Sequence, residues 1–247
     1  MNISLLAIDI RHILLSKRTA YSVALIAVLA IAVAFIAEYS PEGLKEALEA
    51  GAPGSAGIFE LVWFENVMTM FFPLLIVGYG AFVLSDLEDA DMMGLLLTRP
   101  EARLDFLARR IAATTVSFIV VFLASGILVA GAAVAIVGGM KIDVFMAHII
   151  WLLPLCLFIL GLTFFVSVPM RTTTPTVLTS FAICLVLYFT FSLLMASEGG
   201  LPSPWNPMSI GYRILVDAPV AETAVISLGY ACAFFGAGSA WFVKKDI

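Results

Sequence analysis

Residues 144–170, VFMAHIIWLLPLCLFILGLTFFVSVPM, decide the fold class because they contain no Asp, Glu, Lys or Arg. An α-helix crosses a bilayer core of about 30 Å with roughly 20 apolar residues. A charge at the centre of such a helix costs roughly 2.5–3.5 kcal/mol on insertion scales. The apolar residues are continuous rather than alternating, which favours a helix over a strand of a membrane β-barrel. We therefore expect this stretch to be a transmembrane helix.

The rest of the chain has the same apolar character. Of its 247 residues 62% are hydrophobic and 13% are charged, and the mean hydropathy is +1.08. Soluble domains have roughly 45–50% apolar and about 25% charged residues, so a soluble enzyme, a nucleic-acid binder and a disordered chain are excluded. We expect an all-α, polytopic membrane protein that forms one transmembrane domain over residues 1–247. Cutting the chain at its charges predicts six transmembrane helices at residues 20–37, 67–84, 111–140, 144–170, 172–197 and 223–243.

The distribution of Lys and Arg predicts the orientation of these spans. Ten of the thirteen lie in the amino-terminal segment, the connection between spans two and three, the connection between spans four and five, or the carboxyl-terminal end. Only Lys45, Lys141 and Arg213 lie on the other side. Because cytoplasmic connections carry the excess of positive charge, both termini are expected in the cytoplasm. The membrane is expected to be the plasma membrane. An even number of spans requires the same side for both termini.

The amino-terminal residues 3–18 are expected to form a helix that lies in the inner membrane interface. An imperfect apolar face is visible at helical spacing, because some leucines and isoleucines fall outside it. The residues that share the face are Ile3, Leu6, Ala7, Ile10, Ile13 and Leu14.

The cytosolic connection at residues 85–110 contains two helix-start signals. Ser85 with Glu88 fits a capping box, and Thr98 with Glu101 fits a second one. Pro100 is tolerated in the first turn of a helix but not further in. We therefore expect a short cytosolic helix, a break near residues 98–100, and a second helix that continues into span three. The first helix carries a group of apolar residues at the tip of a charged loop, namely Met92, Met93, Leu95, Leu96 and Leu97.

Two interpretations of this apolar tip stay open from the residues alone. Exposed apolar side chains surrounded by charge usually mark a binding surface. The other interpretation is a helix that lies on the membrane with its leucines in lipid. Two connections on the opposite side are also left open. Residues 38–66 are a solvated loop, or else an external gate or partner surface, and residues 198–222 are a rigid interfacial cap or a lid over an outward exit.

Chemistry-bearing patterns are absent from the sequence. His12 and His148 lie near opposite faces of the membrane, and the three cysteines lie inside apolar runs. No phosphate-binding loop, zinc-protease motif or nucleophile motif occurs. We expect no catalytic residue, no metal site, no bound cofactor and no nucleic-acid partner, so the energy for any driven transport must come from another polypeptide.

The whole arrangement resembles the ABC type-2 permease family, the membrane subunits of ATP-driven exporters. The resemblance includes the pattern Glu88-x5-Gly94-Leu95-Leu96-Leu97-Thr98-Arg99-Pro100-x2-Arg103, followed by Arg109-Arg110. It also includes Trp205-Asn206-Pro207 before the last span and the ending Phe242-Val243-Lys244-Lys245-Asp246-Ile247.

The resemblance implies that the short cytosolic helix is a coupling helix that docks on a separate ABC ATP-binding subunit, where ATP and Mg would bind. The residues it implicates in docking are Glu88, Met92, Gly94, Leu96, Leu97, Pro100 and Arg103. It further implies a dimer with a second permease copy or a paralogue, in which spans two and five face each other across the substrate path.

Hydroxyl-bearing residues are the candidates for lining such a path. Hydroxyls inside a span usually bond to the backbone of their own helix or to a neighbouring helix, and a mildly polar pathway lining is the alternative. The candidates are Tyr79 in span two and Thr176, Thr179 and Ser180 in span five. A different function, an ATP-independent membrane scaffold or channel subunit, also fits the composition.

Overall fold

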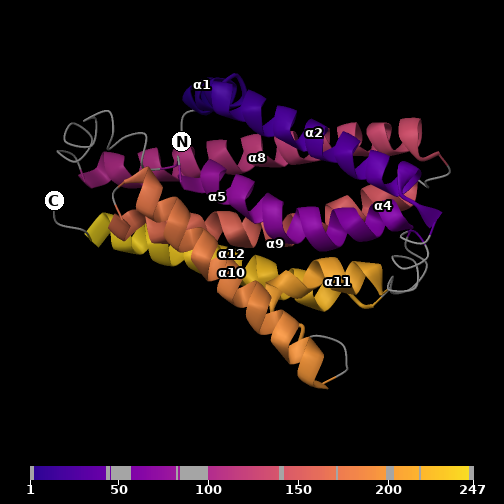
Figure 1. The fold of residues 1–247 in the computed structure, drawn as a ribbon. Helices are drawn as coiled ribbons and strands as arrows, with labels where there is room; N and C mark the ends of the chain where they lie inside the picture. The colour runs from indigo at the N-terminus through magenta and orange to yellow at the C-terminus, as the bar shows by residue number, and fades with distance from the viewer. Residues whose placement is uncertain are drawn as a thin grey trace.

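In a computed structural model, the described residues are 3–42, 45, 57–81, 83, 100–138, 142–170, 172–198, 203–216 and 218–244. Helices make up almost all of this part of the chain, and no strand occurs in it (Figure 1). The elements are α1 (Ile3–Leu14), α2 (Lys17–Tyr39), α4 (Ile58–Leu61), the π-helix η1 (Val62–Phe71), α5 (Phe72–Ala81), α8 (Pro100–Ile136), α9 (Ile142–Met170), α10 (Thr173–Glu198), the 3₁₀ turn η2 (Pro207–Ser209), α11 (Ile210–Leu215) and α12 (Ala221–Lys244).

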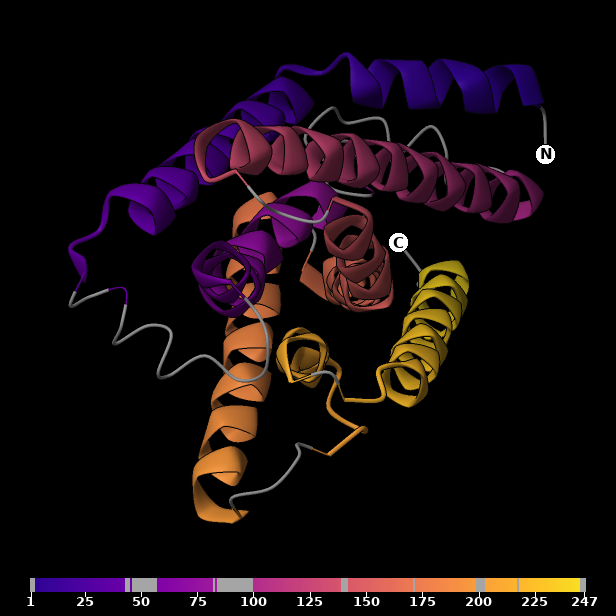
Figure 2. The same cartoon turned by 90° about the vertical axis from the view of Figure 1, so that its right-hand side faces the viewer.

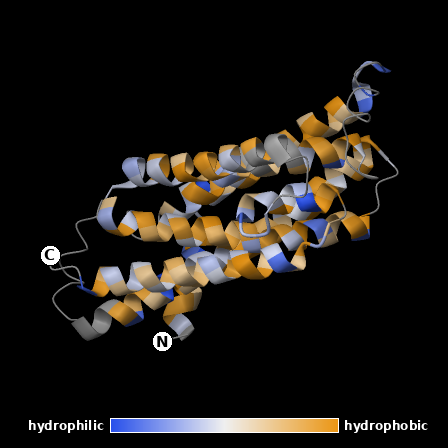
Figure 3. Cartoon of the chain, turned by 90° about the horizontal axis from the view of Figure 1, so that it is seen from below, coloured by the Kyte–Doolittle hydropathy of each residue, from blue (hydrophilic) through white to orange (hydrophobic). Residues whose placement is uncertain are grey.

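Five helical segments of the described residues are long and apolar enough to cross a membrane. The shortest complete helix among them, α2, has 23 residues and is therefore about 34 Å long. Hydrophobic residues run along the length of the helices in Figure 3, as expected where lipid surrounds them. The fold thus fits a multi-pass, all-helical membrane protein. The five segments are Lys17–Tyr39, Leu104–Ile136, Ile142–Met170, Thr173–Thr190 and Ala221–Lys244.

The region of the second predicted span differs from the expectation. Residues 58–66 were expected in an outer connection, but the helix begins at Ile58 and continues through η1 and α5 to Ala81. The ten residues of η1 form a π-helix, in which residues five apart stack on one another. Phe59 of α4 and Phe64 of η1 both contact Phe145 on α9, with ring centres at 6.0 and 5.6 Å. The first turns of this helical run are thereby attached to α9 by two aromatic contacts.

Helix α9 lies at the centre of the bundle and packs against α5, α10 and α12. Apolar residues surround its whole circumference, which is the pattern of a helix buried on all sides. Its contact with α12 is close because two glycines lie in it. A Cβ on Gly161 of α9 would lie 3.0 Å from the Ala231 carbonyl oxygen, and one on Gly238 of α12 would lie 2.6 Å from the Phe164 ring.

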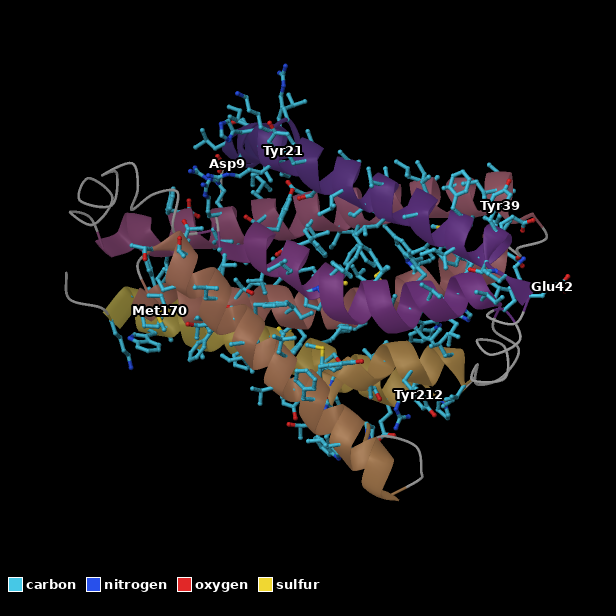
Figure 4. All side chains as sticks on the ribbon, in the orientation of Figure 1. Asp9, Tyr21, Tyr39, Glu42, Met170 and Tyr212 are labelled. Carbon is cyan, nitrogen blue, oxygen red and sulfur yellow. The ribbon has the colours of Figure 1, made fainter. Side chains whose placement is uncertain are left out.

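The bundle has two distinct ends. One end, here called the α1 end, is closed by a separate apolar cluster that contains Val83, Leu107, Val168 and Phe242. This cluster joins the end of α5, the start of α8, the end of α9 and the end of α12. The opposite end, here called the α11 end, contains the stacked rings of α4, η1 and α9. Figure 4 labels Asp9 and Met170 at the α1 end, and Tyr39 and Glu42 at the opposite end.

The chain turns sharply between α1 and α2. Helix α1 is viewed nearly along its axis in Figure 1 and lengthwise in Figure 2, so it runs across the direction of the long helices. Ser16 forms the amino-terminal cap of α2, and its hydroxyl accepts a hydrogen bond from the Thr19 backbone N–H at 3.2 Å. An N-cap residue has extended backbone geometry, which separates the two helices.

The region before α12 that contains η2 and α11 packs compactly into the α11 end and is here called the plug. Met208, Ile210 and Ile214 are buried, and α11 packs against η1 and α9. The Asn206 side chain donates a hydrogen bond to the Leu187 carbonyl oxygen on α10 at 3.2 Å. The described part of this connection is thus packed against the bundle, and the choice between a rigid interfacial cap and a lid stays open.

Candidate functional site

The predicted docking residues lie mostly outside the described part of the chain. This applies to Glu88, Met92, Gly94, Leu96 and Leu97. The other two, Pro100 and Arg103, belong to the first turns of α8. Helix α8 begins at Pro100 and continues without interruption into the third span, which confirms the predicted second helix of this connection.

The helices on either side of this connection end close together. Val83 follows α5 and Leu107 lies in the first part of α8, and both are buried in the same apolar cluster. Phe242 near the end of α12 belongs to this cluster as well. The connection between α5 and α8 therefore leaves and re-enters the bundle at the α1 end, together with both described ends of the chain.

An ion pair attaches α1 to α8 near this connection. The Asp9 carboxylate lies 2.9 Å from Nε of Arg109, and about a fifth of each side chain is exposed. The Arg109 guanidinium also lies 5.5 Å from the centre of the Phe106 ring, which is within the range of a cation–π interaction. Helix α1 is thus held against the helix that emerges from the predicted coupling segment.

Tyr79 is fixed by residues of the α1–α2 corner. Its hydroxyl lies 3.3 Å from the Thr19 hydroxyl, and its ring packs edge-on against Phe118 of α8 at 5.9 Å. Thr19 in turn donates a hydrogen bond to the Ile13 carbonyl oxygen at 2.7 Å. The Tyr79 hydroxyl therefore faces α2 rather than the α10 residues with which it is predicted to line a path.

The three predicted pathway residues of α10 differ in their exposure within the single chain. Thr176 and Ser180 are fully buried, and Thr176 donates to the Thr172 carbonyl oxygen at 2.9 Å. Thr179, by contrast, is partly exposed. It lines an open apolar groove of about 460 Å³ together with Leu178, Ala182, Ile183, Val186 and Leu187. The role of these hydroxyls in a path between two copies stays a prediction.

Several buried polar groups have no counterpart in the sequence-based predictions. Within the described residues, Nε1 of Trp63 and Nδ1 of His148 are buried without a hydrogen-bond partner. Arg213 of α11 is buried, and one of its N–H groups donates to the Pro219 carbonyl oxygen at 2.9 Å. The π-helical geometry of η1 also has no local sequence signal, because helix width depends on which partners the side chains meet. The Pro-rich stretch before α12 was the one signal for the plug.

Potential metal ligands do not gather in the described part of the chain: no group of three or more His, Cys, Asp or Glu residues lies close enough there to hold an ion. The described free cysteines are Cys156 and Cys184, which are buried, and Cys232, which is exposed. The polar features that remain are the ion pair, the Tyr79 contacts and a small hollow beside them.

Comparisons with protein-family models and with curated proteins find no match for this chain. The functional interpretation therefore rests on the sequence pattern and on the geometry described above.

Proposed function

We propose that this chain is the permease subunit of an ABC exporter in the plasma membrane. It has six transmembrane helices, and both of its termini lie in the cytoplasm. Five of these six helices are the apolar segments described above. The remaining one, second in chain order, is the continuous helical run of α4, η1 and α5, whose 24 residues lie within the range of about 17–25 that a span requires. Helix α1 lies along the inner membrane interface in this proposal.

The observation that supports the proposal best is the meeting of four helix ends at the α1 end. The exit of α5 and the entry of α8 are packed against the ends of α9 and α12, and α1 is paired with α8 beside them. A force applied to the connection between α5 and α8 would therefore reach four helices at once. That property is what a coupling segment needs in order to transmit ATP-driven closure of a partner subunit.

Positive charge supports the same orientation. Arg11, Lys17, Arg18, Arg109 and Arg110 all lie in α1, at the start of α2 or in the first turns of α8. Among the described residues, Lys45 and Arg213 belong to the other end. This asymmetry follows the positive-inside rule with the α1 end in the cytoplasm.

The transport path lies between two copies of the chain in this proposal. Helix α10 diverges from the other helices in Figure 1, and its outward side carries the apolar groove beside Thr179. A second copy packed there would enclose a lining with few polar groups, which suits apolar or amphipathic cargo. ATP hydrolysis, with its Mg, takes place on the separate ATP-binding subunit.

Co-purification tests the docking step. The chain is co-expressed with an ATP-binding-cassette subunit from a neighbouring gene, and the two are purified through a tag on one of them. Replacing Leu96 and Leu97 by Asp should abolish association while the permease still inserts. Leu15→Asp is the matched control, because Leu15 is an exposed leucine at the same end outside the predicted docking helix. Unchanged association of the Leu96/Leu97 variant would contradict the docking assignment.

ATPase activity separates the proposal from an ATP-independent scaffold or channel subunit. The purified complex should show vanadate-sensitive ATP hydrolysis that the Leu96/Leu97 variant lacks. A complex that forms without an ATP-hydrolysing partner would favour the scaffold or channel instead.

A further inference from the structure

A small hollow lies at the corner between α1 and α2, on the side that faces α5 and α8. Its volume is about 60 Å³, which is room for roughly two water molecules or for one small oxyanion group. Helices α1, α2, α5 and α8 and the corner residue Ser16 contribute to its wall, so the hollow exists only in the folded chain. The residues that line it are His12, Ile13, Ser16, Arg18, Tyr79, Arg110 and Thr114.

The wall of this hollow is rich in cations and hydrogen-bond donors. Arg18 and Arg110 contribute two guanidinium groups, and His12 contributes an imidazole. None of the described residues that line it is acidic. Asp9, the acidic residue of α1, lies against Arg109 at 2.9 Å, so its charge is already compensated by another arginine.

Arg110 supplies the observation that points to a ligand. Its Nε is buried and has no hydrogen-bond partner among the described residues. Buried polar groups are nearly always hydrogen-bonded, and an unpaired cationic donor is the most costly kind to leave without an acceptor. Thr114 lines the same wall, and its hydroxyl can donate as well, whereas the Tyr79 proton is directed at Thr19, whose own proton goes to the Ile13 carbonyl oxygen. The partner that fits Arg110 in this hollow is therefore a negatively charged hydrogen-bond acceptor.

The surroundings of the hollow indicate where that acceptor comes from. The hollow lies where α1 meets the start of the first span, and Leu5 and Ile8 of α1 and Leu15 of the corner are exposed. A helix with exposed apolar residues and an exposed arginine, Arg11, fits the boundary between acyl chains and headgroups. Phosphate is the anion found at that depth, and basic pockets between membrane helices bind anionic headgroups.

We propose that this hollow binds a phosphate oxyanion, supplied by the headgroup of an anionic phospholipid, with Arg110, Arg18 and His12 as its ligands. The bound phosphate would join the α1–α2 corner to α5 and α8. Lipid composition would then control how firmly α1 is held against the bundle. The site depends on a membrane location and not on an ATPase partner, so it stands independently of the proposed transport function.

Lipid retention by the purified full-length chain tests the proposal. Native mass spectrometry in an uncharged detergent compares phosphatidylglycerol with phosphatidylcholine of the same acyl chains. One phosphatidylglycerol per chain should be retained about tenfold more tightly, because one charged hydrogen bond has roughly that effect on affinity. Equal retention of the two lipids would overturn the proposal.

Inorganic phosphate distinguishes the two sources of the oxyanion. Without acyl chains it should bind more weakly than phosphatidylglycerol, because the apolar contribution of the chains to membrane-surface binding is lost. Binding of inorganic phosphate as tight as that of the lipid would overturn the lipid assignment.

Two variants and one control locate the site. Arg110→Gln should lose the preference for phosphatidylglycerol, whereas Arg11→Gln should keep it, because Arg11 is an exposed arginine of α1 that does not line the hollow. Equal losses in both would indicate general charge attraction and overturn the proposal. If Arg110→Gln does not fold, Thr114→Leu decides: it fills the hollow, keeps every charge, and should also lose the preference.

Discussion

Thr19 shows how a single hydroxyl fixes the corner between two helices. Its side chain donates to the Ile13 carbonyl oxygen and lies 3.1 and 3.3 Å from the hydroxyls of Ser16 and Tyr79. Its backbone N–H caps α2 through Ser16. Because Thr19 is buried, removing its hydroxyl takes a partner from both the Ile13 carbonyl oxygen and the Tyr79 hydroxyl. One side chain therefore links the end of α1, the start of α2 and Tyr79 of α5.

Thr19→Val should lower the free energy of unfolding by about 1–3 kcal/mol, because it leaves buried polar groups without their partner. Thr190→Val is the control: Thr190 is exposed and donates to the Val186 carbonyl oxygen within its own helix. Its change should be within about 0.5 kcal/mol. Denaturation of the purified chain followed by circular dichroism measures both. A Thr19→Val variant as stable as the original chain would show that the corner does not depend on this hydroxyl.

At the scale of elements, two kinds of contact hold the helices together. Helix α1 is attached to α8 by the Asp9–Arg109 ion pair, whereas α9 and α12 approach closely through glycines. Lipid offers no hydrophobic driving force between helices, so close packing of small residues and polar contacts decide which helices associate. Each kind of contact leads to a separate prediction.

Asp9→Asn should loosen α1 from α8, measured as faster hydrogen exchange of the α1 backbone. Only 22% of the Asp9 and 18% of the Arg109 side chain is exposed, so the loss should be about 1–3 kcal/mol, the cost of leaving a largely buried polar partner unsatisfied, rather than the 0–1 kcal/mol typical of a surface pair. Exchanging the two residues, Asp9→Arg with Arg109→Asp, should restore protection. If the exchanged pair stays as loose as Asp9→Asn, the ion pair is not what holds α1.

Gly238→Ala should destabilise the α9–α12 contact by about 1–3 kcal/mol, the usual cost of overpacking. The new Cβ would lie 2.6 Å from the fully buried Phe164 ring and 3.3 Å from the Phe165 backbone. Gly236→Ala, two residues away, is a matched control because nothing lies within 4 Å of its Cβ position. It should be neutral or stabilising, since alanine favours a helix by up to about 1 kcal/mol. Thermal denaturation in detergent measures both variants. Equal melting temperatures of Gly238→Ala and Gly236→Ala would contradict the close contact at Gly238.

At the scale of the whole molecule, the proposed dimer predicts which surface meets a second copy. Val186 lines the groove on α10 and is 64% exposed, whereas Val225 on α12 is 68% exposed. These equal exposures make the two valines a matched pair on different faces. In a Cys232→Ser background, Val186→Cys should form an oxidised dimer in membranes and Val225→Cys should not. Cross-linking through Val225 alone would place the partner on the other face.

The accuracy of the sequence-based predictions differs between elements for physical reasons. The predicted spans at α2, α9, α10 and α12 lie close to the observed helix bounds, because these apolar runs have charges at their ends and none inside, where a charge would be costly in lipid. In the region of the second predicted span the helix begins at Ile58, nine residues before the predicted start at residue 67, since Glu60 and Glu65 interrupt the apolar pattern while the helix continues through them. Tyr79 was grouped with the hydroxyls of α10, but a residue list does not reveal which side of α5 a side chain faces.

The sequence by itself determined that this chain is helical and apolar and that its positive charges gather at one end of the spans. The reason is that lipid penalises buried charges and unpaired backbone groups, which excludes other arrangements. Tertiary structure alone decided the π-helical turn under Phe145, the buried plug around Met208, and the hollow beside Arg110. Each of these depends on side chains from three or more helices meeting at one place. Such meetings follow from packing between distant segments, which no local pattern of residues encodes.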